Sequence, residues 1–116
     1  MAKASLRGRL VVAVALVLAG CASAHTESVV VVKDRGKVDL TRFKCTSDTG
    51  SGFITRICYD ARNRYMVIGF EDGTYRQYCK VDASIPNGLL AAPSKGRFYG
   101  TRILGDVKNG PYACGA

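Results

Sequence analysis

The clearest alternation of hydrophobic and polar residues lies between positions 53 and 79. The segment FITRICYD is rich in residues that favour strands, and YMVIGF places Met66, Ile68 and Phe70 at every second position. The polar letters ARNR separate these segments, and Asp72-Gly73, a strong hairpin signal, precedes YRQYC. The pattern predicts three short strands in an antiparallel meander.

A short helical pattern follows the predicted strands. Asp82 or Ser84 is a candidate N-cap, and Pro86 lies early, where a first helical turn tolerates proline. Residues 89–92, LLAA, favour a short helix that Pro93 limits.

The flanking segments are less regular. Residues 97–104, RFYGTRIL, fit a short extended or helical piece, and the four valines at 29–32 fit either a strand or a linker. We therefore expect an α+β fold, a small three-stranded antiparallel β-meander followed by a short helix, stapled by disulfides.

The N-terminal residues resemble an export signal. Basic residues precede an apolar run at positions 10–18, which is shorter than the about 20 residues of a membrane-spanning helix. Residues 18–21, LAGC, resemble the bacterial lipobox, in which the cysteine is alkylated with diacylglycerol and becomes the mature N-terminus. The rival is residues 22–24, ASA, an ordinary signal-peptidase site that would leave His25 first.

We expect lipidation at Cys21, because the lipobox is the more demanding pattern. Ala22 in the second mature position favours the outer membrane facing the periplasm, by resemblance to known lipoproteins. Cleavage after Ala24 would instead give a soluble periplasmic or secreted protein. The expected organisation is a signal peptide at 1–20, a tether at 21–37 and a folded domain at 38–116.

Removal of the signal lowers the net charge. The chain carries +8, and residues 1–20 hold three basic and no acidic residues, so the mature chain carries +5. A moderately basic surface serves solubility, and it can also face phosphate, anionic lipid or polysaccharide.

Four cysteines remain after Cys21, and an even count in a short exported chain predicts two disulfides. Their spacing has no C-x-x-C pair and no nearby His, so we expect no metal and no cofactor. Four cysteines allow three pairings. The meander favours Cys45–Cys114 and Cys58–Cys79, although the first and third strands would lie about 9.5 Å apart, beyond disulfide reach unless the third veers.

The stretches ITRICYDARNRYMVIGFEDGTYRQYCKV and LLAAPSKGRFYGTRI resemble the KTSC domain, over roughly residues 51–104. That domain is named for its occurrence at the C-terminus of some lysyl-tRNA synthetases, and it also occurs alone in small bacterial proteins. The shared features are Tyr59-Asp60, an alternating second strand, a third strand with tyrosines, and an Ala-x-Ser-x-Gly-x-aromatic-aromatic signature at 92–99.

The third strand departs from the family pattern. The family usually has Tyr-x-Tyr, whereas Tyr75 and Tyr78 are separated by two residues. In a regular strand they point to opposite faces, and a bulge would be needed to realign them. The family usually also has proline after the valine that closes the strand, whereas Asp82 follows Val81.

The function of the family that this chain resembles is not established, and its synthetase context suggests an RNA-binding role, in which aromatic rings on one sheet face stack bases among basic residues. Export disfavours nucleic acid, so the same surface could face a cell-envelope component or a protein partner. Each tyrosine can also be a half-buried sheet residue with a solvated hydroxyl. The candidate binding residues are Tyr59, Arg76, Tyr78, Lys95 and Arg97.

We do not expect an enzyme. The single histidine, His25, lies in the predicted tether, so a nucleophile–His pair is disfavoured. Asp60 and Asp72 suit turns, and Ser94 suits a helix cap. The expected function is an exported, lipid-anchored, non-catalytic binding or interaction module, with nucleic-acid binding as the alternative.

Overall fold

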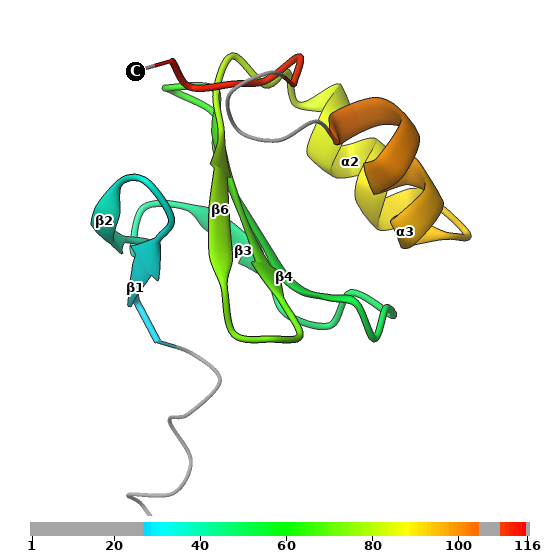
Figure 1. The fold of residues 1–116 in the computed structure, drawn as a ribbon, viewed down its shortest axis with the longest axis horizontal. Helices are drawn as coiled ribbons and strands as arrows, with labels where there is room; N and C mark the ends of the chain where they lie inside the picture. Colours follow the sequence, from blue (N-terminus) through cyan, green and yellow to red (C-terminus); the bar gives the residue numbers. More distant parts are fainter. Residues whose placement is uncertain (1–26, 105–109, 116) are drawn as a thin grey trace, which may run out of the picture.

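The computed structural model describes residues 27–104 and 110–115. In this part of the chain a mixed six-stranded sheet has the order β2-β1-β6-β5-β4-β3. Figure 1 shows the helices on one side of the sheet and the β1–β2 hairpin on the other. The strands are β1 (Val29–Val32), β2 (Gly36–Asp39), β3 (Lys44–Thr46), β4 (Ile54–Asp60), β5 (Tyr65–Phe70) and β6 (Tyr75–Tyr78).

The predicted meander is the centre of this sheet. β4, β5 and β6 are antiparallel neighbours, and the Asp72-Gly73 turn joins the last two, with Gly73 at a φ of +88°. Every residue of β5 is buried. A strand buried on both faces needs cover on both sides, so three strands with one short helix would have left half of its side chains exposed to water.

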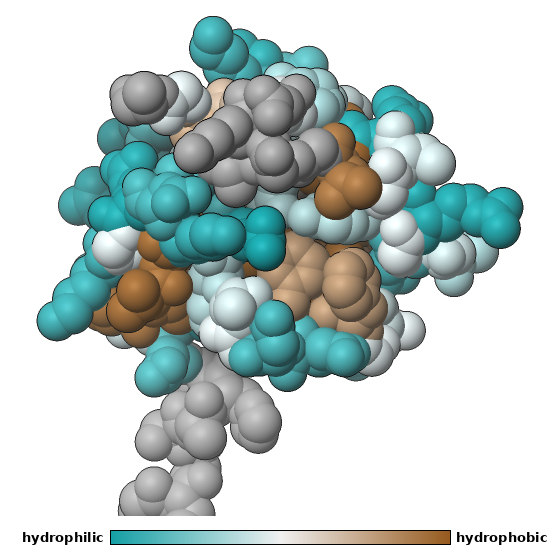
Figure 2. Space-filling model, in the orientation of Figure 1, coloured by the Kyte–Doolittle hydropathy of each residue, from teal (hydrophilic) through white to brown (hydrophobic). Residues whose placement is uncertain are grey.

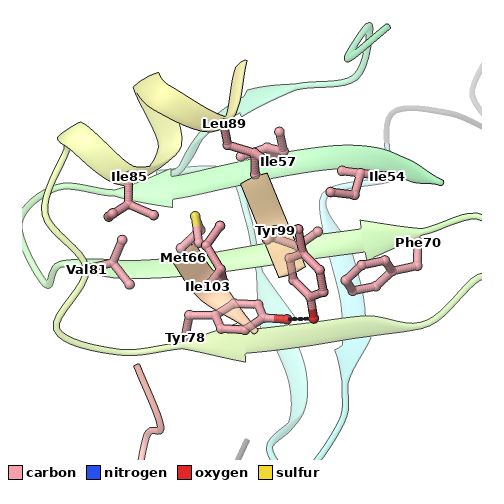
Figure 3. Close-up of a cluster of buried hydrophobic side chains, with 11 residues drawn as sticks. Ile54, Ile57, Met66, Phe70, Tyr78, Val81, Ile85, Leu89, Tyr99 and Ile103 are labelled. Atoms are coloured by element: carbon pink, nitrogen blue, oxygen red, sulfur yellow. Dashed lines mark hydrogen bonds between the residues drawn. The ribbon is translucent and has the colours of Figure 1, made fainter. Parts of the chain in front are cut away.

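The helical cover is longer than predicted. It comprises α2 (Ser84–Ala91), α3 (Lys95–Phe98) and a π-helical turn, η1 (Tyr99–Ile103). Gly88 lets the helices approach, because a Cβ there would lie 2.8 Å from the Phe98 ring. The helices and one sheet face enclose the helix-side cluster (Figure 3), made of Ile54, Ile57, Met66, Ile68, Phe70, Tyr78, Val81, Ile85, Leu89, Tyr99 and Ile103.

The other sheet face is covered by residues before the meander. β1 buries Val30 and Val32 and exposes Val29 and Val31, so this run, left open between strand and linker, is a strand. Burial of each valine contributes about 1.5–3 kcal/mol. The sheet therefore begins inside the stretch expected as a tether. This far-side cluster consists of Val30, Val32, Leu40, Cys58, Tyr65 and Val67.

The sheet has more strands than the three predicted, because further strands pair with both edges of the meander. β1 pairs in parallel with β6 through Val32 and Tyr75, and β3 pairs antiparallel with β4. The β1–β6 pairing joins segments far apart in sequence, whereas β3 is a three-residue strand that pairs with the next strand along the chain.

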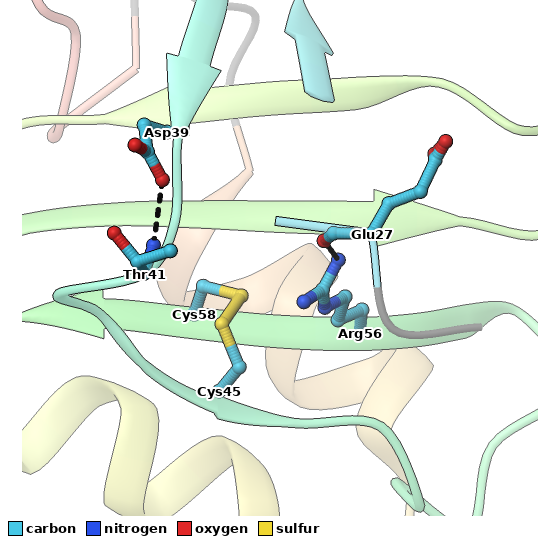
Figure 4. Close-up of a disulfide and its surroundings, with 6 residues drawn as sticks. All are labelled: Glu27, Asp39, Thr41, Cys45, Arg56 and Cys58. Atoms are coloured by element: carbon cyan, nitrogen blue, oxygen red, sulfur yellow. Dashed lines mark hydrogen bonds between the residues drawn. A yellow bond between two sulfur atoms is a disulfide. The ribbon is translucent and has the colours of Figure 1, made fainter. Parts of the chain in front are cut away.

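The two disulfides are present, but the favoured pairing was wrong. Cys45 bonds Cys58 (Figure 4), because β3 places these residues directly opposite each other on adjacent strands. Cys79 bonds Cys114, and the Cys79 N–H donates to the Tyr112 carbonyl at 2.8 Å. β5 lies between β4 and β6, which keeps Cys58 away from Cys79.

The predicted signal peptide, the lipidation site Cys21 and the alternative cut after Ala24 lie outside the described residues. Within the described ranges, no helix has the length and hydrophobicity needed to cross a bilayer.

Candidate functional site

Tyr75 and Tyr78 point to opposite faces of the sheet. The β5–β6 register runs without a bulge from Gly69–Tyr75 to Met66–Tyr78. Tyr78 is 3% exposed, and its hydroxyl lies 2.7 Å from that of Tyr99. Burial, and secondarily this hydrogen bond, raises the pKa of Tyr78 far above its ordinary value. Tyr78 is a core residue, so Tyr75 and Tyr78 do not form the paired stacking platform that the family resemblance would imply.

Tyr59 also makes an internal bond. Its hydroxyl donates to the Val81 carbonyl at 2.5 Å, which joins the end of β4 to the segment leading into α2. Burial raises the pKa of Tyr59, and the negative charge of Asp82 adds to that effect. Burial similarly raises the pKa of Tyr65, whose hydroxyl donates to Gln77, against the lowering effect of Arg35.

Arg76 lines an aromatic hollow of ≈ 340 Å³ beside the helix-side cluster. Phe53, Phe70 and Tyr99 form its wall, with ring centroids 5.3–5.9 Å apart. Phe53 is 44% exposed and Leu104, at the rim, 52%. Figure 2 shows apolar surface exposed among hydrophilic surroundings on one face of the molecule.

Lys95 and Arg97 belong to the helical layer instead. Ser94 caps α3, because its hydroxyl accepts a hydrogen bond from the Arg97 N–H. Lys95 donates to the Ala92 carbonyl at 3.0 Å. Arg97 lines a hollow of ≈ 380 Å³ whose other residues are Ala92, Pro93, Ser94, Phe98, Thr101 and Arg102. The five candidate residues are therefore divided between the core and two separate surfaces.

Sequence reasoning missed Arg102, which lines the same hollow as Arg97. Its guanidinium carbon lies 5.4 Å from the centre of the Phe98 ring, within cation–π range. Residues five apart are not neighbours on a regular α-helix. The Leu104 N–H bonds the Tyr99 carbonyl, five residues earlier, and marks the wider π-helical turn.

A third hollow, of ≈ 700 Å³, was also missed. The loop between β3 and β4 forms one wall, and Arg56 and Tyr75 line the same hollow from the sheet. No element was predicted for the loop residues 47–52, SDTGSG, so the sequence carried no signal that they meet Arg56 and Tyr75.

The side chains weighed for catalysis have structural partners. Asp60 accepts from the Asn63 amide at 2.7 Å. Asp72 accepts from the backbone and hydroxyl of Thr74, which lowers the pKa of the Asp72 carboxyl. The described residues contain no group of three His, Cys, Asp or Glu side chains placed to hold a metal ion.

The fold and its surfaces define a small, disulfide-bonded α+β domain with a helical layer on one sheet face. The KTSC domain family model matches residues 50–106. A KTSC domain protein from Yersinia pestis with a known crystal structure has 31% sequence identity to this chain. The two structures superpose with a TM-score of 0.51, and the match covers 55% of this chain and 89% of that one. The chain belongs to the KTSC domain family. No curated protein matches it.

Proposed function

We propose that this KTSC protein is an exported, non-catalytic binding module of the cell envelope, anchored by lipid at Cys21 to the outer membrane and facing the periplasm. Its helical layer contacts a phosphate-bearing envelope component. Two acyl chains would hold the domain stably on the membrane, where a single chain is marginal. Cleavage after Ala24 would give the soluble alternative.

One observation carries the binding role. Residues 83–104 contain Lys95, Arg97 and Arg102 and no acidic residue. None of the three forms an ion pair with another described residue, whereas Arg64 pairs with Asp82 at 2.9 Å. Arg97 and Arg102 are both exposed and line one apolar hollow, where their charges are available to an anion.

The disulfides support export. Structural disulfides persist in oxidising compartments and are rare in the cytosol of most organisms. One bond, Cys45–Cys58, joins two adjacent strands, and the other, Cys79–Cys114, ties the residue after β6 to the C-terminal segment. Together with the lipobox-like residues 18–21, they fit a domain that folds after leaving the cytosol.

Intact mass of the protein from its host, with and without reductant, tests the location. The proposal requires a mature chain that begins at Cys21, carries acyl mass, and gains four hydrogens on reduction. A chain that begins at His25 would leave the binding role but remove the anchor. A chain that retains residues 1–20 would contradict export.

Sedimentation with vesicles tests the binding role separately. A Cys21→Ser form without lipid should bind phosphatidylglycerol vesicles but not phosphatidylcholine vesicles, and binding should weaken with salt. The Arg97→Gln, Arg102→Gln double variant should lose this binding. The matched control carries Arg42→Gln and Arg62→Gln, which remove two exposed charges elsewhere. It should bind the vesicles about as well as the Cys21→Ser form. Equal loss in both would mean that net charge alone is responsible.

A further inference from the structure

The largest of the three hollows lies away from the helical layer. Its ≈ 700 Å³ falls within the about 300–1,000 Å³ typical of ligand sites. It is lined from three directions, by the β3–β4 loop, the sheet and the segment before β1. The lining residues are Glu27, Ser47, Asp48, Thr49, Gly50, Ser51, Gly52, Thr55, Arg56 and Tyr75.

A row of three residues across β4, β5 and β6 builds the sheet side of the hollow. Arg56 is paired with Gly69, and Gly69 is paired with Tyr75. The Tyr75 ring lies over Gly69, with Cε2 only 2.7 Å from the position a Cβ would occupy. The missing side chain of Gly69 therefore gives the ring room to extend across β5 towards Arg56.

The guanidinium of Arg56 is held by a backbone carbonyl rather than by a carboxylate that would neutralise its charge. Its Nη1 donates to the Glu27 carbonyl at 2.7 Å (Figure 4), and no described carboxylate forms an ion pair with it. Its Nε–H is buried and has no acceptor among the described residues. An unsatisfied buried donor is costly and needs an explanation, and an acceptor supplied by a bound molecule is one.

The loop wall is fixed by its own hydrogen bonds. The Thr49 hydroxyl donates to the Ile54 carbonyl, and the Ser51 hydroxyl accepts from the Phe53 and Ile54 N–H groups. In contrast, no side-chain hydrogen bond to another described residue is made by Ser47, Asp48 or Thr55. The hollow thus presents unused polar groups on a preformed wall.

The mixture of charges restricts the ligand. Glu27 offers Arg56 its backbone carbonyl, and Figure 4 shows its carboxylate turned away from the guanidinium. A phosphate bound to Arg56 would share the hollow with the Asp48 carboxylate, and a metal ion at that carboxylate would share it with the guanidinium. A neutral polyhydroxyl molecule can accept from arginine, donate to carboxylates, and lay a C–H face on an aromatic ring. We propose that this hollow is a binding site for a neutral saccharide, with Tyr75 as its platform and Arg56 and Asp48 as its hydrogen-bonding partners.

Titration of the oxidised Cys21→Ser protein with two neutral probes, chitotetraose and maltotriose, tests the site by NMR. At least one probe should bind, with shift changes concentrated in residues 47–56 and at Tyr75, and added salt should not weaken binding. Arg56→Gln should weaken the affinity at least tenfold. Gly69→Ala should do the same while keeping every polar group, because the new Cβ displaces the Tyr75 ring.

Controls separate this site from the basic helical layer and from misfolding. Asp48→Asn changes an exposed loop residue, so it should weaken binding without affecting folding. Arg62→Gln and Arg97→Gln should leave saccharide affinity unchanged. The proposal is overturned if neither probe binds the parent protein, if Asp48→Asn binds as tightly as the parent, or if inorganic phosphate competes. Loss of vesicle binding would not affect it, because different residues carry that role.

Discussion

The hydroxyl pair of Tyr78 and Tyr99 allows a sharp test of how the helical layer is held on the sheet. Replacing either residue by phenylalanine keeps the ring and removes one oxygen. The rings meet edge to face, with centroids 6.3 Å apart, so the apolar packing should persist in each variant. Figure 3 shows the two hydroxyls meeting inside the helix-side cluster.

The size of the effect follows from burial. Tyr78 is 3% and Tyr99 7% exposed, so a hydroxyl that loses its partner has little access to water. A neutral hydrogen bond contributes about 1 kcal/mol net, and leaving a buried partner unsatisfied costs about 1–3 kcal/mol. Each single variant should therefore lose about 1–2 kcal/mol. Replacing both removes the unsatisfied group, so the double variant should lose less than the sum.

These losses of stability can be measured by thermal unfolding of the oxidised protein, monitored by circular dichroism. For a domain of this size about 1 kcal/mol corresponds to about 4–8 °C in Tm. Tyr112→Phe is the control, because no hydrogen bond of its hydroxyl to another described residue is present, and its Tm should stay close to that of the parent. If the Tyr78→Phe and Tyr99→Phe losses add to within about 0.5 kcal/mol in the double variant, the hydroxyls are not coupled and the reasoning is refuted.

Three further predictions concern pH, disulfides and capping. Tyr59, Tyr65 and Tyr78 have raised pKa values and stay neutral in the folded state, whereas in the unfolded chain they ionise near pH 10.0. The stability of the fold should therefore be full below that pH and fall above it, which Tm values between pH 8 and 12 would measure. Loop lengths of 13 and 35 residues predict losses of about 3 kcal/mol without Cys45–Cys58 and about 4 kcal/mol without Cys79–Cys114, checked by urea unfolding of double alanine variants. Ser94→Ala should cost about 1 kcal/mol in the same assay, as loss of a cap does.

Local signals predicted the centre of the fold well. Met66, Ile68 and Phe70 at alternate positions marked β5, and Asp72-Gly73 placed the turn before β6. The KTSC resemblance over residues 51–104 agrees with the family match at 50–106. These features depend on neighbours in sequence, which is why a single chain reveals them.

Features outside the meander, or buried by contacts with the helices, were harder to predict. β3 is only three residues long, and its pairing with β4 decides which cysteine meets Cys58. Without β3, the same sequence gave the wrong disulfide pairing. The opposite orientation of Tyr75 and Tyr78 was within reach, because strand periodicity requires it when no bulge intervenes. Burial of Tyr78 was not, since it depends on Tyr99 in η1.

The segment before the family match explains why the candidate saccharide site could not be read from the KTSC signature. Arg56, Gly69 and Tyr75 lie within the matched residues 50–106, whereas Glu27 and Asp48 precede them. The same preceding segment supplies β1 and β3 at the two edges of the meander and covers the far-side cluster. One stretch of chain therefore closes the sheet face and completes the third wall of the hollow. It follows that a KTSC domain limited to the matched region would keep the Tyr75–Arg56 row but lack the Asp48 carboxylate that we propose helps to select a neutral ligand.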